Sequence, residues 1–310
     1  MSNLPVIEVE NLVVEYGRGS TATRAVDGIS FKVMPGECVG FIGANGAGKS
    51  TTIKTLLGFI FPRQGQVRVF GSPAGTVESR QRIGYLPEVA LYYPFMKARE
   101  LLELYGGLQG LGRAELKRRI PPLLEEVGLA GRGETLLKNF SKGMQQRLGI
   151  AQAIIAEPEA LIFDELSSGL DPVGKFDLRQ VLLKLKQAGR TIFFSSHELT
   201  EVESLCDRVI MIHKGRIVTE ATVQELMKPL NEFQVVFQLP DGSPVPDSIS
   251  RHKPERDGSN WRASIRDTAE YAAAVADLSQ CGARIVSTSS NSRSLEDYFI
   301  SLVRGTGGNA

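Results

Sequence analysis

A glycine-rich segment carries the residue types and spacing of a phosphate-binding loop. It fits the pattern G-x-x-x-x-G-K-S/T with Gly43, Ala44, Asn45, Gly46, Ala47, Gly48, Lys49 and Ser50. The apolar run 38–42 before it predicts a strand, and residues 51–57 after it predict a helix. Glycines permit the tight bend and expose backbone N–H groups to an anion, and the helix presents its positive end. We expect Lys49 to bridge the β- and γ-phosphates of a nucleotide and Ser50 to ligate Mg²⁺.

An acidic pair further along the chain has the form of a second nucleotide motif. Asp164 and Glu165 directly follow the fully apolar run 161–163, which predicts a buried strand. An aspartate at such a strand end can hold Mg²⁺ through water, and the adjacent glutamate can orient or deprotonate an attacking water. An acidic pair after a strand is commonly only a solvated strand end, but the phosphate loop upstream favours the catalytic interpretation.

Two further side chains are candidates by their position. His197 lies just beyond the apolar run 191–194, where a lone histidine is more often structural than functional. Tyr16 lies just after the first predicted strand. It could stack on a nucleotide base through its ring, and a plain structural role is about equally compatible with the sequence.

The predicted elements form a sheet that presents these residues. Apolar strands alternating with helices indicate a mainly parallel sheet covered on both faces. Strands over 6–14, 25–33 and 66–70 predict an antiparallel β lobe, with a turn at 17–20. Residues 97–129 read as helical, with Pro121 and Pro122 weakening or restarting the second helix. Further helices are expected over 140–156, with Ser141 as N-cap, and over 176–186, and a hairpin at 209–218.

The character of the sequence changes after about residue 230. Strands are expected over 233–238, 261–265 and 284–287, and helices over 268–280 and 294–302. The predicted fold class is therefore an α/β domain over 1–230, with a helical insert at about 90–156, and a small α+β accessory domain over 231–304. Residues 305–310 read as a flexible tail.

Composition excludes several classes of protein. The 310 residues carry 36 Lys and Arg against 35 Asp and Glu, so the net charge of +1 gives no electrostatic reason to expect nucleic-acid binding. The three cysteines, Cys38, Cys206 and Cys281, lack any C-x-x-C spacing and favour a reducing compartment over a disulfide framework. The N-terminal residues do not read as a signal peptide, and no apolar run is long enough to span a bilayer.

From about Val6 to Glu220 the chain resembles the ATP-binding subunit of ABC transporters, of the exporter-type (ABC-2-like) group, which has a P-loop NTPase fold. The loop matches over 43–51, so Thr51 joins the ATP-binding residues, and Tyr16 matches the base-stacking aromatic. The acidic motif matches at 161–165, the D-loop at 168–172 with Asp171, and the switch histidine at His197. The LSGGQ-type signature appears as Ser141, Lys142, Gly143, Met144 and Gln145.

The resemblance implies a mechanism. Two cassettes, expected as a homodimer, would pack head to tail around two ATP, with each ATP between the phosphate loop of one and the signature of the other. Glu165 would be the general base, and His197 and Lys49 would contact the γ-phosphate. Gly143 would allow close approach of the backbone to that phosphate. The expected cofactors are ATP and Mg²⁺, with Ser50, Glu88 and Asp164 as metal ligands.

Several positions depart from the family pattern. Glu88 stands where glutamine is usual, which keeps an oxygen ligand but adds negative charge. Lys142 and Met144 replace glycines of the signature, and Leu166 replaces the proline that normally follows the catalytic glutamate. The segment 294–299 is weakly similar to the closing helix of some exporter subunits.

Three functions remain open at this point. The leading one is an ATP-hydrolysing subunit that drives a separate multi-span membrane permease for export of an unidentified substrate. It would be cytoplasmic, held on the inner face of the cell membrane through that permease. The second is an ABC-type ATPase acting on ribosomes or nucleic acid, although no nucleic-acid partner is expected. The third, motivated by Leu166 and Glu88, is a non-catalytic, ATP-gated binding module.

Overall fold

The computed structural model describes residues 4–17, 22–227, 233–240, 242–290, 295–296 and 298–299. The chain divides into two compact units, Met1–Val223 and Gln224–Ala310. This division falls ahead of the boundary expected between residues 230 and 231. The division into an ATP-binding domain over 1–230 and an accessory domain over 231–304 stays a prediction.

A six-stranded sheet forms the centre of the first unit. Its strand order is β10-β9-β3-β8-β7-β6, and every neighbouring pair is parallel except β10 with β9, which form the expected hairpin. β3 and β7 are buried at every position because helices and the second sheet cover both faces. The strands are β3 (Cys38–Ile42), β6 (Ile83–Leu86), β7 (Ala160–Asp164), β8 (Thr191–Ser196), β9 (Arg208–His213) and β10 (Arg216–Thr222).

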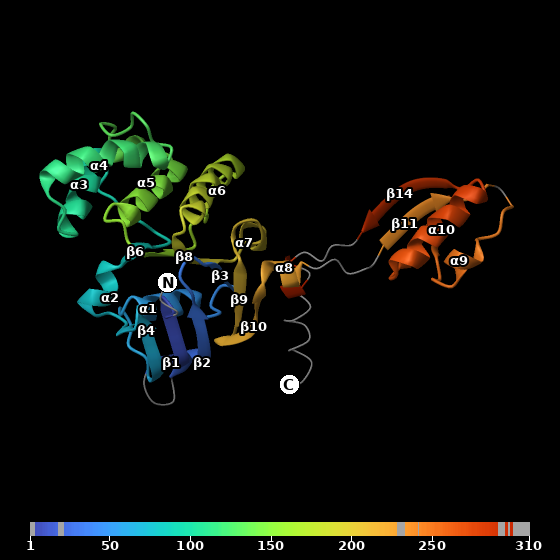
Figure 1. Ribbon diagram of the computed structural model, residues 1–310, viewed down its shortest axis with the longest axis horizontal. Helices are drawn as coiled ribbons and strands as arrows, with labels where there is room; N and C mark the ends of the chain where they lie inside the picture. Colours follow the sequence, from blue (N-terminus) through green and yellow to red (C-terminus); the bar gives the residue numbers. More distant parts are fainter. Residues whose placement is uncertain are drawn as a thin grey trace. The chain divides into compact units, whose positions relative to one another are not determined.

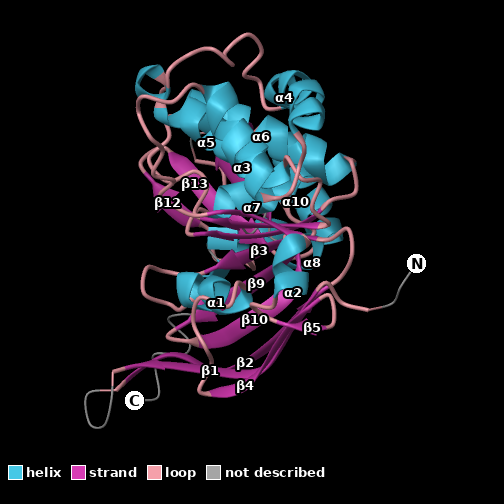
Figure 2. Cartoon of the chain, turned by 90° about the vertical axis from the view of Figure 1, so that its left-hand side faces the viewer, coloured by secondary structure: helices cyan, strands magenta, loops and turns pink. Residues whose placement is uncertain are grey.

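The predicted antiparallel lobe is present as a second sheet, with strand order β2-β1-β4-β5. Helix α1 (Lys49–Leu56) lies between the two sheets (Figure 2) and buries Ile53 and Leu56 in the core that they share. Phe31 of this lobe stacks on Phe193 of β8, with ring centroids 5.7 Å apart. The strands are β1 (Ile7–Tyr16), β2 (Thr23–Val33), β4 (Gln64–Val69) and β5 (Ser72–Pro73).

The helical insert lies on the other side of the parallel sheet (Figure 1). It consists of α3 (Ala98–Leu108), α4 (Arg113–Glu126) and α5 (Lys142–Ile154), and α2 (Val77–Gln81) precedes β6. The expectation that Pro121 and Pro122 restart the second helix is wrong, because α4 runs through both. Each proline removes one helical hydrogen bond, but α4 buries one apolar side that holds the helix, Leu116, Ile120, Leu123 and Leu124.

The helices that follow β7 and β8 complete the first unit. α6 (Pro172–Gln187) begins four residues ahead of the predicted helix, because Asp171 caps it and Pro172 suits its first turn. α7 (Leu199–Leu205) follows β8 and was not predicted, and α8 (Val223–Leu226) follows β10. Cys38 and Cys206 are buried and free, as expected for residues that serve packing.

The second unit is an antiparallel sheet of order β12-β13-β11-β14 with its own apolar core against α10. Helix α10 (Thr268–Gln280) has the predicted bounds, and Asp267 caps it. The expected helix 294–302 lies mostly outside the described residues, as do the turn residues 18–20 and the tail 305–310. The other elements are α9 (Asp247–Ser250), β11 (Phe233–Gln238), β12 (Glu255–Asp257), β13 (Asn260–Ile265) and β14 (Arg284–Ser290).

Candidate nucleotide-binding site

The phosphate loop joins the end of β3 to the start of α1, as the sequence predicts. Lys49 is the first residue of α1, and its side chain is only 5% exposed. Its ammonium donates to the carbonyl of Gly43, with Nζ and O 2.7 Å apart. The lysine therefore lies folded against the loop from which it comes, with its charge on the side where a phosphate would bind.

Two glycines of the loop are required by close packing. A Cβ on Gly43 would lie 2.4 Å from the carbonyl oxygen of Ile212. A Cβ on Gly48, whose φ is +112°, would lie 2.7 Å from the carbonyl oxygen of Ala25. Gly46 also has a positive φ, +78°, but open space around it. The β lobe and β9 therefore pack directly against the loop and restrict its conformation.

Asp164 ends β7 beside the loop. Its Oδ1 accepts hydrogen bonds from Ser50 Oγ at 3.2 Å and from Ser195 Oγ at 2.6 Å. A hydroxyl and a carboxylate in contact are the hard oxygen donors that suit Mg²⁺. Asp164 also acts on its surroundings: burial and the Asp164 charge together raise the pKa of Tyr85 to about 12.

Glu165 has two charged or polar partners, one for each carboxylate oxygen. Lys49 Nζ lies 3.0 Å from Oε1, and His197 Nδ1 contacts Oε2. The backbone of Glu165 is left-handed, with φ +51°, which a non-glycine residue rarely adopts. Its N–H is held by Ser195, whose hydroxyl and carbonyl oxygens lie 3.1 and 3.2 Å away. A strained residue fixed by its neighbours is typical of a functional site.

One pocket of about 610 Å³ is lined by residues from the phosphate loop and the start of α1, together with Glu88, Glu165 and His197. Asp164, Gly43, Ala44 and Ala47 are not in its lining. Tyr16 lies beside the pocket, 45% exposed, with its hydroxyl 3.2 Å from Thr51 Oγ1. Ser168, the first residue of the D-loop match, also lines the pocket. Ala25 lines it too and was not predicted, because its side chain carries no distinctive chemical group. The predicted residues in the lining are Asn45, Gly46, Gly48, Lys49, Ser50, Thr51, Glu88, Glu165 and His197.

The signature residues do not line this pocket. Ser141 caps α5, accepting a hydrogen bond from the Met144 N–H at 3.2 Å. A Cβ on Gly143 would meet no atom closer than 3.8 Å, so this glycine is not required by packing within its own chain. Asp171 caps α6 through the Gly174 N–H at 2.8 Å and is likewise absent from the lining. None of Ser141, Lys142, Gly143, Met144, Gln145 and Asp171 belongs to the pocket that holds Lys49 and Glu165.

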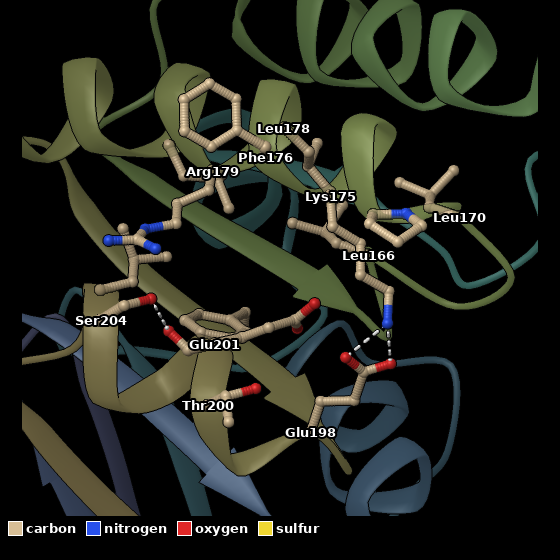
Figure 3. A pocket seen from close by; sticks show the side chains of 14 residues that line it. Leu166, Leu170, Lys175, Phe176, Leu178, Arg179, Glu198, Thr200, Glu201 and Ser204 are labelled. Carbon is tan, nitrogen blue, oxygen red and sulfur yellow. Dashed lines mark hydrogen bonds and ion pairs between the residues drawn. The ribbon is translucent and has the colours of Figure 1, made fainter.

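A second pocket, of about 430 Å³, lies between α6 and α7, and Leu166, the residue that follows Glu165, is part of its lining (Figure 3). Lys175 and Glu198 pair across it, with Nζ and Oε2 2.6 Å apart. The side chain of Glu201 points into it, and burial raises the pKa of that carboxyl above its usual value, against the hydrogen bonds of Ser167 and Ser196. Nothing in the sequence predicts this pocket, because its lining comes from α6, α7, β8 and the loop after β7, none of which has a distinctive motif facing it.

Comparison with known proteins agrees with a nucleotide-binding site at the phosphate loop. Residues 26–168 match the family model described as ABC transporter. The Bacitracin transport ATP-binding protein BcrA of Bacillus licheniformis is 36% identical, over 97% of this chain and 98% of its own length. The Linearmycin resistance ATP-binding protein LnrL of Bacillus subtilis (strain 168) is 36% identical, over 74% of each chain.

A solved structure described as the ATP-binding subunit of an ABC transporter has a TM-score of 0.62 and 36% identity. The match covers 71% of this chain and 91% of that one. The chain therefore belongs to the family of exporter-type ABC transporter ATP-binding proteins, with the α/β P-loop NTPase fold, and it is an ABC-type ATP hydrolase.

Proposed function

We propose that this chain works as one of two cassettes that enclose two ATP and drive a separate membrane permease, exporting an unidentified substrate. One observation carries the proposal. The signature residues 141–145 lie outside the pocket formed by Lys49, Glu165 and His197, although the family's chemistry uses both sets. A second copy in a two-fold arrangement brings a signature to each phosphate loop, so neither chain is complete alone.

The residues of the pocket fit the steps of ATP hydrolysis. The γ-phosphate competes with Glu165 for the ammonium of Lys49, which now lies 3.0 Å from the carboxylate. Once Lys49 binds phosphate, Glu165 is free to accept a proton from the attacking water. His197 holds the other carboxylate oxygen and orients the base toward that water. Tyr16, half exposed beside Thr51, is placed to stack on the adenine.

Mg²⁺ fits the oxygen ligands at this site. Ser50 and Asp164 are already in contact, and Glu88 lines the same pocket. These three residues would hold the ion, which neutralises charge on the β- and γ-phosphates during transfer. The carboxylate of Glu88 adds a negative charge where the family usually has an amide. We therefore expect ATP turnover to depend more strongly on the Mg²⁺ concentration than it would with an amide at this position.

The membrane part of the transporter is assigned to another polypeptide. Among the described residues, no helix is long and apolar enough to cross a membrane. Two relatives of similar sequence are named for bacitracin transport and linearmycin resistance, which supports export across the cell membrane. We place the chain at the inner face of that membrane, bound to a multi-span permease.

Co-purification tests the assignment to a permease. The full chain, tagged and expressed in its own cells, is extracted from detergent-solubilised membranes. We expect a multi-span membrane protein to be recovered with it in a stoichiometric ratio, and recovery to persist at high salt. Recovery of ribosomes or nucleic acid in place of a membrane protein, lost at high salt, would favour the alternative function instead.

A further inference from the structure

Ser195 occupies a central position between the two nucleotide motifs. It lies on β8, between β3, which leads into the phosphate loop, and β7, which ends in the acidic pair. In the parallel registers it is the partner of Phe41 on one side and of Asp164 on the other. Its side chain is 0% exposed. A hydroxyl at such a position must find its hydrogen-bond partners within the protein.

The hydroxyl of Ser195 joins the side chain of one acidic residue to the backbone of the next. It donates to Asp164 Oδ1 at 2.6 Å and accepts from the Glu165 N–H at 3.1 Å. The same Oδ1 atom also accepts from Ser50 Oγ at 3.2 Å. One hydroxyl therefore restrains the candidate Mg²⁺ ligand and the candidate base together.

The backbone of Glu165 explains why such a restraint matters. Its left-handed conformation is unfavourable for a residue with a side chain, so surrounding contacts must hold it. The Ser195 hydroxyl and carbonyl oxygens provide two of those contacts. Leu166, which follows, lacks the rigid ring of the proline expected there and adds no restriction of its own to Glu165.

We propose that Ser195 is a positioning residue for hydrolysis, which orients Asp164 toward Mg²⁺ and fixes the backbone from which Glu165 reaches the attacking water. This inference rests on the proposed roles of Asp164 and Glu165. It predicts that loss of the hydroxyl weakens the Mg²⁺-dependent part of nucleotide binding and turnover, and leaves metal-free nucleotide binding intact.

The neighbouring serine supplies a matched control. Ser196 is 3% exposed and lies on the same strand, but its hydroxyl accepts from the Glu198 N–H at 2.9 Å and contacts Glu201 Oε2 at 3.2 Å. Ser195→Ala and Ser196→Ala therefore remove the same group from equally buried positions. Both should lower the thermal unfolding midpoint by similar amounts, and only the first removes bonds to Asp164 and Glu165.

The experiment compares the full-length wild type, Ser195→Ala and Ser196→Ala. Affinity for a fluorescent ATP analogue is measured in EDTA and across a Mg²⁺ titration, and ATP turnover is measured over the same titration. For Ser195→Ala we expect metal-free affinity within about twofold of wild type, about tenfold more Mg²⁺ needed for half-maximal binding, and about tenfold lower kcat. Ser196→Ala should keep the wild-type Mg²⁺ dependence.

A conservative variant adds a rescue. Ser195→Thr retains the hydroxyl and should recover most of the Mg²⁺ dependence lost in Ser195→Ala. The inference is overturned if Ser195→Ala binds Mg²⁺-nucleotide like wild type, or if Ser196→Ala changes the Mg²⁺ titration equally. Failure of the proposed function gives a different result, namely a wild type without ATP turnover. In that case the Mg²⁺ titration of nucleotide binding still decides the role of Ser195.

Discussion

Lys49 and Glu165 form a buried ion pair, with Nζ 3.0 Å from Oε1 and side chains 5% and 8% exposed. One is the phosphate-binding lysine and the other is the candidate base, so the pair links substrate binding to the reaction. Each partner neutralises the charge of the other in a buried position, where water does not solvate it. Phosphate binding must therefore separate them, and changes at either residue should affect both stability and catalysis.

Lys49→Ala should destabilise the chain as well as abolish turnover. It leaves the Glu165 carboxylate buried beside His197 without its cation, at a cost of about 3 kcal/mol in the free energy of unfolding. Adding Glu165→Gln removes the unpaired charge, so the double variant should be more stable than Lys49→Ala alone. Urea unfolding of the two variants checks this, and a double variant that is the less stable one would contradict the structure.

Glu165→Gln alone should separate ATP binding from hydrolysis. The amide cannot accept the proton of the attacking water, so turnover should fall by about 100-fold or more. ATP then remains bound, and the chain should elute as a dimer with ATP and Mg²⁺ but not with ADP. Size-exclusion chromatography with light scattering measures this, and a monomer under every nucleotide condition would count against the paired arrangement.

The glycines of the loop should differ in their tolerance of alanine. At Gly43 a Cβ would lie 2.4 Å from the Ile212 carbonyl oxygen, so Gly43→Ala should cost about 2 kcal/mol and lower ATP affinity by shifting the loop. Gly46→Ala has open space and should cost only the backbone strain of a positive φ, about 1 kcal/mol. Thermal unfolding and ATP titration of both variants test the order, and equal effects would contradict it.

Glu201 should make stability depend on pH. Burial raises its pKa in the folded chain, so the ionised carboxylate costs stability above that pKa, and the cost disappears as pH falls through it. Ser167, Ser196, Glu198 and Lys175 are the groups that act on it. Glu201→Gln should therefore be more stable than wild type at about pH 7.5, with a smaller difference at about pH 5. Urea unfolding at the two values measures the difference, and one that widens on acidification would contradict the burial argument.

The sequence predicts those parts of the site that depend on local chemistry. The loop, the acidic pair and His197 follow buried strands, and parallel strands bring their ends to one edge, so their convergence is predictable. The bonds of Ser195 were not predictable, because they depend on the register between β8 and β7. The same holds for α4, where tertiary burial outweighs the effect of Pro121 and Pro122 on the helix.

Mixing two defective chains tests whether the site is shared. Gly143→Asp places a carboxylate where the partner's γ-phosphate is expected, and the variant should fold because a Cβ at Gly143 would meet no atom closer than 3.8 Å. Lys49→Ala disables the other half of the site. Each variant alone should be inactive, but a mixed dimer contains one site with both defects and one site with neither.

The mixture should therefore regain turnover, up to about one quarter of the wild-type rate per chain if subunits exchange at random and sites act independently. ATPase assays across mixing ratios measure this, with the maximum expected at equal amounts. Recovery of untagged Gly143→Asp with tagged Lys49→Ala on an affinity column serves as the control for subunit exchange. No recovery at any ratio, with exchange demonstrated, would mean either that both sites must be intact together or that the signature acts within its own chain. Retained turnover in Gly143→Asp alone would refute the shared site outright.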